Sequence, residues 1–407
     1  MPEQIIKRRS RGFICVNAHP EGCRVNVERQ IAAISRETTG GIPGGTTGKG
    51  GKLPRNVLVI GASTGYGLAS RIAAAWGCGA RTLGVFFERP PEGDKTASAG
   101  YYNTVALHQR AKTDGLFAAS LNGDAFSDET KRQAIEIIRR ELAPLDLVIY
   151  SLASPKRTDP RTGAVYNSVL KPIGQPYGSR TIELDSGKVT GVTLEPASAR
   201  EIADTVAVMG GDDWRLWMEA LSSEGLLARE ITALAYSYIG PELTWPIYRD
   251  GTIGRAKKDL DLAAHALNEM LLEEHGGHAW VSVNKAVVTQ ASAAIPVVPL
   301  YLSALMKVMQ AKGLEEHPIE QMRRLFSEVL FRGTVPAMDS AGRIRLDDRE
   351  MRPDVQAEVS ALFPQVTTEN LRELTDFAGF QREFRNLFGF EVEGVDYELP
   401  VETDLAW

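Results

Sequence analysis

The chain has 407 residues, of which 43% are hydrophobic and 24% charged, and its net charge is −6. This composition excludes an intrinsically disordered chain and is typical of a globular enzyme. The acidic balance argues against a nucleic-acid partner, which a basic face would bind. Cys15, Cys23 and Cys78 cannot all pair. Because the N-terminal apolar run is also too short for a signal-peptide core, we expect a cytoplasmic protein.

An alternation of strand-like and helical segments begins at residue 55. Strands are predicted at 56–63, 81–88, 116–124 and 145–153, with helices between them at 67–77, 103–113 and 128–142. Strands and helices that alternate at this spacing form parallel strands joined by right-handed crossovers. The sequence therefore predicts an α/β fold with a doubly wound, Rossmann-type, mostly parallel sheet.

The chain after residue 153 departs from this alternation. A β-hairpin excursion is expected at 181–196, and further helices and strands are expected at 199–209, 213–227, 231–240, 254–274, 279–289, 291–312 and 317–331. The predicted division is an N-terminal segment 1–54 with a flexible Gly-rich insertion at 37–54, a Rossmann core with this enlarged helical portion at 55–332, and a C-terminal portion at 333–407 packed on the core.

No membrane segment is expected. The longest apolar stretch, 293–306, contains Pro296 and Pro299 and is shorter than the roughly 20 apolar residues that a bilayer crossing needs. This stretch is either a wall of an apolar pocket or an ordinary buried helix.

A glycine-rich turn lies where the first strand hands over to a helix. Gly61 permits a tight turn, Gly65 lets the backbone approach a pyrophosphate, and Gly67 permits close packing of helix and strand. A phosphate would also meet the free N–H groups and the positive end of the helix dipole. The segment therefore predicts a dinucleotide site, although a purely structural turn is the alternative.

Glu88 ends the second strand, about 20 residues after the last glycine, where an acid can bind the adenosine ribose and repel a 2′-phosphate. This position favours NADH, although the neighbouring Arg89 offers a partner for that phosphate. Asp124 and Ala125 end the third strand and are candidate adenine contacts, with Asp124 as a helix cap being the alternative. Leu152 and Ala153 end the fourth strand and are candidate contacts to the nicotinamide ribose.

The candidate for a catalytic Tyr–Lys pair has an unusual spacing in this chain, and a chance occurrence of the two residues at that spacing is the alternative. Short-chain dehydrogenases place a tyrosine and a lysine as Tyr-x3-Lys, but none of the eleven tyrosines has a lysine four residues later. Tyr248 and Lys257 instead form Tyr-x8-Lys. Nine residues do not share one helix face, so the spacing predicts a loop tyrosine and a lysine in the first turn of the following helix. A tyrosine hydroxyl can stabilise developing charge on a substrate oxygen.

At these residues a family resemblance becomes specific. GASTGYGLA, GVFFERP, GDAFSDE, YSLASPKR, YSYIG, YRDGTIGRAKKDL and VNKAVVTQASAAIP follow one another in the order found in trans-2-enoyl-CoA reductases and FabV-type enoyl-acyl-carrier-protein reductases. The chain resembles this family from about residue 4 to residue 397. The resemblance implies a monomeric, NADH-dependent enzyme of fatty acid biosynthesis that reduces the C2–C3 double bond of an enoyl thioester on acyl carrier protein or coenzyme A.

The resemblance also implies that the enlarged helical portion within 55–332 binds the substrate, and it implies roles for individual residues. Tyr248 would be the proton-donating catalytic residue, Lys257 would contact the nicotinamide ribose, and Tyr238 and Thr289 would contact substrate. The positions that match cofactor contacts are Gly61, Ala62, Ser63, Thr64, Gly65, Tyr66, Phe87, Glu88, Asp124, Ala125, Leu152, Ala153, Lys257, Ala286, Val287 and Val288.

Two other functions remain open at this stage. A short-chain-type carbonyl reductase would share the Rossmann core, although the missing Tyr-x3-Lys counts against it. A dinucleotide-sensing protein without catalysis would share the glycine turn. We expect no metal site, because His275 and His278 lack accompanying ligands at metal spacing, and no flavin, because 333–407 shows no dinucleotide fingerprint.

Overall fold

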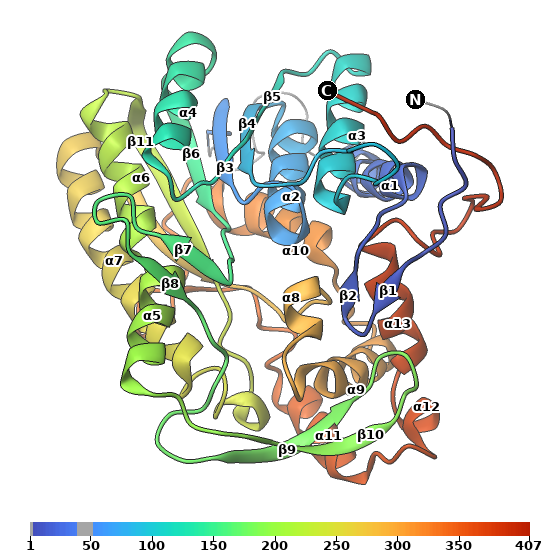
Figure 1. The fold of residues 1–407 in the computed structure, drawn as a ribbon. Helices are drawn as coiled ribbons and strands as arrows, with labels where there is room; N and C mark the ends of the chain where they lie inside the picture. Colours follow the sequence, from blue (N-terminus) through green and yellow to red (C-terminus); the bar gives the residue numbers. More distant parts are fainter. Residues whose placement is uncertain (1–2, 39–51) are drawn as a thin grey trace.

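The computed structural model describes residues 3–38 and 52–407 (Figure 1). Residues 39–51, which make up most of the predicted Gly-rich insertion, lie outside the described residues. Segments near the two ends of the chain meet, because Gln4 and Val401 form an antiparallel bridge.

A seven-stranded sheet with only parallel pairs forms the centre, in the order β13-β12-β11-β6-β3-β4-β5. From β3 the chain adds β4 and β5 on one side of β3, and it then crosses over to form β6 on the other side of β3. A ligand-binding crevice is therefore expected where the strand order reverses, at the carboxyl ends of β3 and β6. The strands are β3 (Asn56–Ile60), β4 (Arg81–Phe86), β5 (Ala118–Asn122), β6 (Leu145–Tyr150), β11 (Leu227–Ser237), β12 (His278–Val283) and β13 (Ile344–Arg345).

Helices cover both faces of the sheet, as the apolar strands require. In β3, Val57 and Val59 pack against one helical layer, whereas Leu58 and Ile60 pack against the other, and all four are fully buried. The first layer holds α1 (Pro20–Thr38), α2 (Gly65–Ile72), α3 (Ala99–Thr113) and α10 (Pro318–Arg324). The second holds α4 (Asp128–Glu141), α6 (Asp212–Ser223) and α7 (Thr252–His275), against which α5 (Ala199–Met209) packs. The predicted doubly wound α/β fold is confirmed.

A third apolar cluster lies beyond the sheet and joins distant segments. The expected hairpin is confirmed as β9 (Tyr177–Ile182) paired with β10 (Val189–Leu194), and Figure 1 shows it in green across the lower helices. Its neighbours are α8 (Gln290–Ala293), α9 (Val298–Ala311), α11 (Pro353–Leu362), α12 (Leu371–Leu374) and α13 (Phe377–Asn386). Two small hairpins, β1 (Ser10–Arg11) with β2 (Ile14–Cys15) and β7 (Lys156–Thr158) with β8 (Val165–Asn167), complete the strands of the described residues.

Several elements differ from the sequence prediction, which also lacked the hairpin β7–β8 and the helices α11, α12 and α13. The single helix expected over 291–312 is wrong, because α8 ends at Ala293, and Pro296 and a φ of 79° at Val297 interrupt the helical conformation before α9 begins. Helix α1 was not predicted, although Val27, Ile31 and Ile34 carry the helical spacing of its buried face. The strand expected at 279–289 ends at Val283, and β13, an edge strand from the C-terminal portion, was not predicted.

Among residues 3–38 and 52–407, no helix combines the length and apolar character needed to cross a bilayer.

Candidate active site

The glycine turn connects β3 to α2 with the geometry expected from its sequence. Gly61 has a φ of +84°, and a Cβ atom there would lie 2.3 Å from the Ser151 carbonyl oxygen after β6. A Cβ atom at Gly67 would lie 1.9 Å from the Gly61 carbonyl oxygen, so only glycine allows the helix to pack this closely. At Gly65, by contrast, a Cβ atom would have no atom of the described residues within 4 Å. The turn is therefore tight toward the sheet and open on the other side.

Glu88 is held next to this turn by polar contacts from three elements. The Ser63 hydroxyl donates to Glu88 Oε1 at 2.7 Å, and Asn103 on α3 donates to the Ser63 carbonyl oxygen at 3.1 Å. Asn122 at the end of β5 accepts from the Glu88 N–H and donates to its carbonyl oxygen, both at 2.8 Å. Phe87 is 80% exposed. Sequence reasoning did not identify Asn103 or Asn122.

A cavity of about 710 Å³ opens beside the glycine turn. The cofactor and substrate candidates that line it come from three places in the chain: Thr64, Gly65, Glu88, Ala286, Val287, Val288 and Thr289. The side chains of Leu302 and Met306 on α9 line it too, so the apolar stretch 293–306 contributes to this cavity wall. The Thr289 hydroxyl also caps α8, where it accepts from the Ser292 N–H at 2.9 Å.

Tyr66 joins the glycine turn to the ends of β11 and β12. Its hydroxyl donates to the Lys285 carbonyl oxygen at 2.7 Å, and its ring meets the Tyr236 ring edge-on at 6.0 Å. The Lys257 Nζ donates to the Tyr236 carbonyl oxygen at 3.3 Å. Burial lowers the pKa of Lys257 to about 8. Lys257 lies in the second turn of α7, because α7 begins at Thr252, and the predicted first-turn placement is wrong.

Tyr248 lies in the loop before α7, which matches the prediction of a loop tyrosine followed by a helix lysine. Its side chain is buried, and its ring packs edge-on against Tyr238 with centroids 4.8 Å apart. Burial raises the pKa of the Tyr248 phenol, so the hydroxyl keeps its proton at neutral pH. Within the part of the chain that the structure describes, no residue forms a hydrogen bond with this hydroxyl. Tyr248 is therefore free to donate to a ligand.

A buried carboxylate from the C-terminal portion completes this region. Glu350 Oε1 accepts from the Tyr238 hydroxyl at 3.0 Å and from the Tyr301 hydroxyl at 2.6 Å, and Oε2 accepts from the Ala286 N–H at 2.7 Å. The sequence did not indicate Glu350 or Tyr301. Glu350 sits in the polar run LDDRE, which resembles a solvent-exposed segment.

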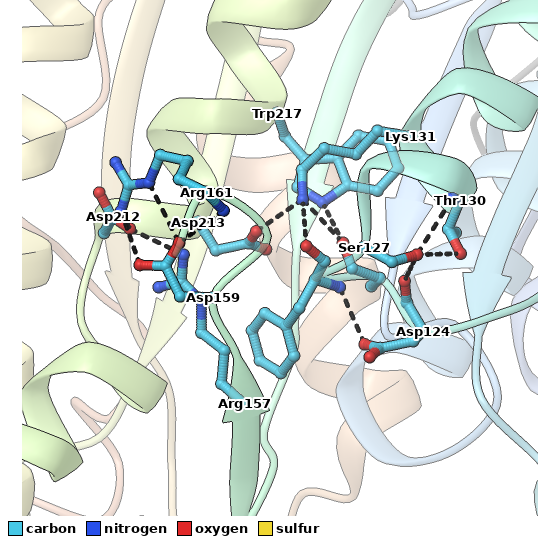
Figure 2. A network of polar contacts seen from close by, with 12 residues as sticks. Asp124, Ser127, Thr130, Lys131, Arg157, Asp159, Arg161, Asp212, Asp213 and Trp217 are labelled. Atoms are coloured by element: carbon cyan, nitrogen blue, oxygen red, sulfur yellow. Dashed lines mark hydrogen bonds and ion pairs between the residues drawn. The ribbon is translucent and has the colours of Figure 1, made fainter. Parts of the chain in front are cut away.

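The loop after β5 is fixed by the charged network in Figure 2. Lys131 donates to the Ala125 carbonyl oxygen at 3.0 Å and pairs with Asp213 at 2.8 Å, and both charged side chains are buried. Ser127 caps α4, while the Asp124 carboxylate accepts from the Phe126 N–H. The helix-cap interpretation of Asp124 is therefore wrong. Asp124 and Ala125, like Leu152, Ala153, Tyr238, Tyr248 and Lys257, lie outside the lining of the 710 Å³ cavity.

One group of potential metal ligands occurs among the described residues. Oxygen and nitrogen atoms of Glu315, His317 and Glu383 lie within 4.8 Å of one another, and all three residues line the cavity. Exposed acidic groups often gather without an ion, and the absence of a metal site stays a prediction.

Known protein families account for most of the chain. The family described as "Trans-2-enoyl-CoA reductase catalytic region" matches residues 95–331, and the "NAD(P)H binding domain of trans-2-enoyl-CoA reductase" matches residues 5–93. The chain belongs to the trans-2-enoyl-CoA reductase family. A third family, described as "Enoyl reductase FAD binding domain", matches residues 338–401.

Relatives of the trans-2-enoyl-CoA reductase family match over nearly their whole length. An enoyl-[acyl-carrier-protein] reductase [NADH] from Opitutus terrae is 54% identical and covers 98% of this chain and 99% of its own. A trans-2-enoyl-CoA reductase [NADH] from Ruminiclostridium cellulolyticum is 52% identical, with 98% of each chain covered. The crystal structure of Treponema denticola trans-2-enoyl-CoA reductase in complex with NAD has a TM-score of 0.93 and 47% identity, covering 99% of this chain and 100% of the other.

Proposed function

We propose that the protein is an enoyl thioester reductase that uses NADH to saturate the C2–C3 double bond of a trans-2-enoyl group. The observation that carries this proposal is the Tyr248 hydroxyl, which is protonated, buried and without a partner among the described residues, in a chain of this family. A carbonyl reductase of the short-chain type is not supported, because no tyrosine has a lysine four residues later.

The residues around the glycine turn fit a dinucleotide. The open side of Gly65 and the first turn of α2 offer N–H groups to a pyrophosphate, while Gly61 and Gly67 keep the turn flat against the sheet. Glu88 would accept hydrogen bonds from the adenosine ribose, and its charge would repel the 2′-phosphate of NADPH. Lys257 would contact the nicotinamide ribose. The remaining cofactor roles of 62–66, Phe87, Asp124, Ala125, Leu152, Ala153 and 286–288 are proposed on the same basis.

The chemistry follows from charge development at the thioester. NADH, when bound, supplies the hydride that adds to C3, and negative charge then builds on the carbonyl oxygen. Tyr248 donates a hydrogen bond to that oxygen, and a donor placed for a developing oxyanion contributes about 3–4 kcal/mol. The Lys257 ammonium favours this charge electrostatically. Tyr248 then gives its proton to the enolate and regains one from solvent, and the product protonated at C2 leaves as the saturated acyl thioester.

The C-terminal portion does not fit a flavin dinucleotide. Its single strand, β13, has two residues, and no glycine turn leads from it into a helix among 338–401. Gly389 serves packing instead, because a Cβ atom there would lie 2.4 Å from the His19 carbonyl oxygen. We therefore propose an enzyme without flavin, and an absorbance spectrum of the purified protein without a flavin band would support this.

Loss of NADH absorbance with crotonyl-CoA tests the proposed function, with NADPH as the matched control. Rapid oxidation of NADH and slow oxidation of NADPH are expected. No oxidation with coenzyme A or acyl-carrier-protein substrates of several chain lengths, by protein shown to bind NADH, would contradict the proposal and favour a dinucleotide-sensing protein. We further propose a monomeric cytoplasmic enzyme of fatty acid biosynthesis, and the relative rates with the two carriers would identify the physiological one.

A further inference from the structure

A fully buried carboxylate lies behind the active-site tyrosines, although it comes from the C-terminal portion of the chain. Glu350 follows β13 and has no exposed surface. Burying an ionised carboxylate is costly unless hydrogen bonds and a counter-charge compensate it. The contacts of the Glu350 side chain therefore indicate which part of the protein depends on this buried carboxylate.

Two of the three hydrogen bonds to the Glu350 side chain among the described residues come from residues of the proposed site, and the third comes from Tyr301 on α9. Tyr238 and Tyr301 donate to one carboxylate oxygen, and the Ala286 N–H donates to the other. Ala286 lines the cavity, and the Tyr238 ring packs edge-on against Tyr248. Glu350 thus connects the cavity wall to the ring that supports Tyr248.

These contacts give the two neighbouring tyrosines different hydrogen-bonding states. A tyrosine hydroxyl has one proton, and Tyr238 uses its proton on Glu350. The Tyr248 hydroxyl has no such acceptor among the described residues. Only Tyr248 can then donate a proton toward a substrate oxygen, while Tyr238 can only accept.

We propose that Glu350 is a positioning residue of the reductase site, which fixes Tyr238 as a donor to itself and thereby leaves Tyr248 as the single hydroxyl donor of the pair. This inference rests on the proposed function. Glu350 touches no reacting atom in it and acts through Tyr238.

The surroundings of Glu350 determine when its carboxylate is ionised. The titratable groups that act on it are Lys285, Tyr66, Tyr238, Tyr248 and Tyr301. Burial raises the pKa of Glu350, while the Lys285 ammonium and the hydrogen bonds lower it by a smaller amount. As pH falls through this raised pKa, the carboxyl group takes up a proton and becomes a donor, so Tyr238 is no longer fixed as a donor to Glu350. The turnover rate is therefore expected to fall on the acid side.

The decisive variant is Glu350→Gln, which keeps the shape of the side chain but replaces one acceptor oxygen by an NH₂ donor. The Ala286 N–H requires the remaining oxygen, so the amide would point its NH₂ group at Tyr238 and Tyr301 and reverse both bonds. We expect kcat to fall about tenfold or more, with KM for NADH nearly unchanged and the acid limb of the pH–kcat profile absent. Glu350→Asp, which retains a carboxylate, should recover part of kcat.

The matched control is Asp347→Asn in the same segment. Asp347 is also buried, but it pairs with Arg345 and has no contact with the tyrosines. It should keep the wild-type kcat and acid limb. If Glu350→Gln does not fold, Tyr301→Phe replaces it: the lost hydrogen bond should move the acid limb to higher pH.

The outcomes separate this inference from the proposed function. An active wild type with an unaltered kcat and acid limb in folded Glu350→Gln, or an unmoved limb in Tyr301→Phe, would overturn the role of Glu350 alone. A wild type that binds NADH but reduces no enoyl thioester would overturn both.

Discussion

Replacement of Tyr248 by phenylalanine tests the central residue of the proposed mechanism. The substitution removes only a hydroxyl group that has no hydrogen-bond partner among the described residues, and the ring keeps its edge-on contact with Tyr238. The free energy of unfolding should therefore change by less than about 1 kcal/mol. In the transition state, however, the variant loses a donor to the developing oxyanion. That loss corresponds to about 3–4 kcal/mol, or a fall in kcat of roughly 10²–10³-fold.

The assay is steady-state oxidation of NADH with crotonyl-CoA, with kcat and KM determined separately, together with thermal unfolding and NADH binding. Tyr102→Phe is the matched control, because the Tyr102 hydroxyl is buried on α3 and donates to the Thr403 carbonyl oxygen at 2.9 Å. This control should lose about 1–3 kcal/mol of stability and keep its kcat. A folded Tyr248→Phe variant whose kcat stays within a few-fold of wild type would refute the reasoning.

Three further predictions address the lysine, the cofactor preference and the charged network. Because the mechanism uses the Lys257 ammonium, kcat should fall as pH rises through about 8, and Lys257→Arg should move that fall to higher pH. An alkaline limb that does not move in the variant would mean that another group causes the fall in kcat. Glu88→Ala should raise the ratio of kcat/KM for NADPH over NADH about tenfold, because the 2′-phosphate is no longer repelled; unchanged discrimination would remove Glu88 from this role. Lys131→Met should lower the free energy of unfolding in urea by about 3–5 kcal/mol, since Asp213 loses its buried partner, and a change below about 1 kcal/mol would contradict it.

Local features of the chain were sufficient to predict the strand, glycine turn and helix with which the sheet begins. The conformation of the turn depends on the backbone freedom of the glycines at 61, 65 and 67 themselves. The strand 56–60, which is buried on both faces, is likewise indicated by its own apolar residues and the two-residue period of a strand. The spacing of Tyr248 and Lys257 was likewise enough to place one in a loop and the other in a helix.

The tertiary structure alone decided how the C-terminal portion enters the site. Glu350 lies 112 residues from Tyr238 in the chain, and nothing in the run LDDRE distinguishes a buried acceptor from a solvated acid. Its environment arises only when β13 joins the sheet edge beside β12 and brings the following turn to Tyr301 and Ala286. The same holds for the pairing of Lys131 with Asp213, 82 residues apart. Local sequence specifies periodicity and turns, whereas the partner of a buried charge depends on which distant segments the packed core brings together.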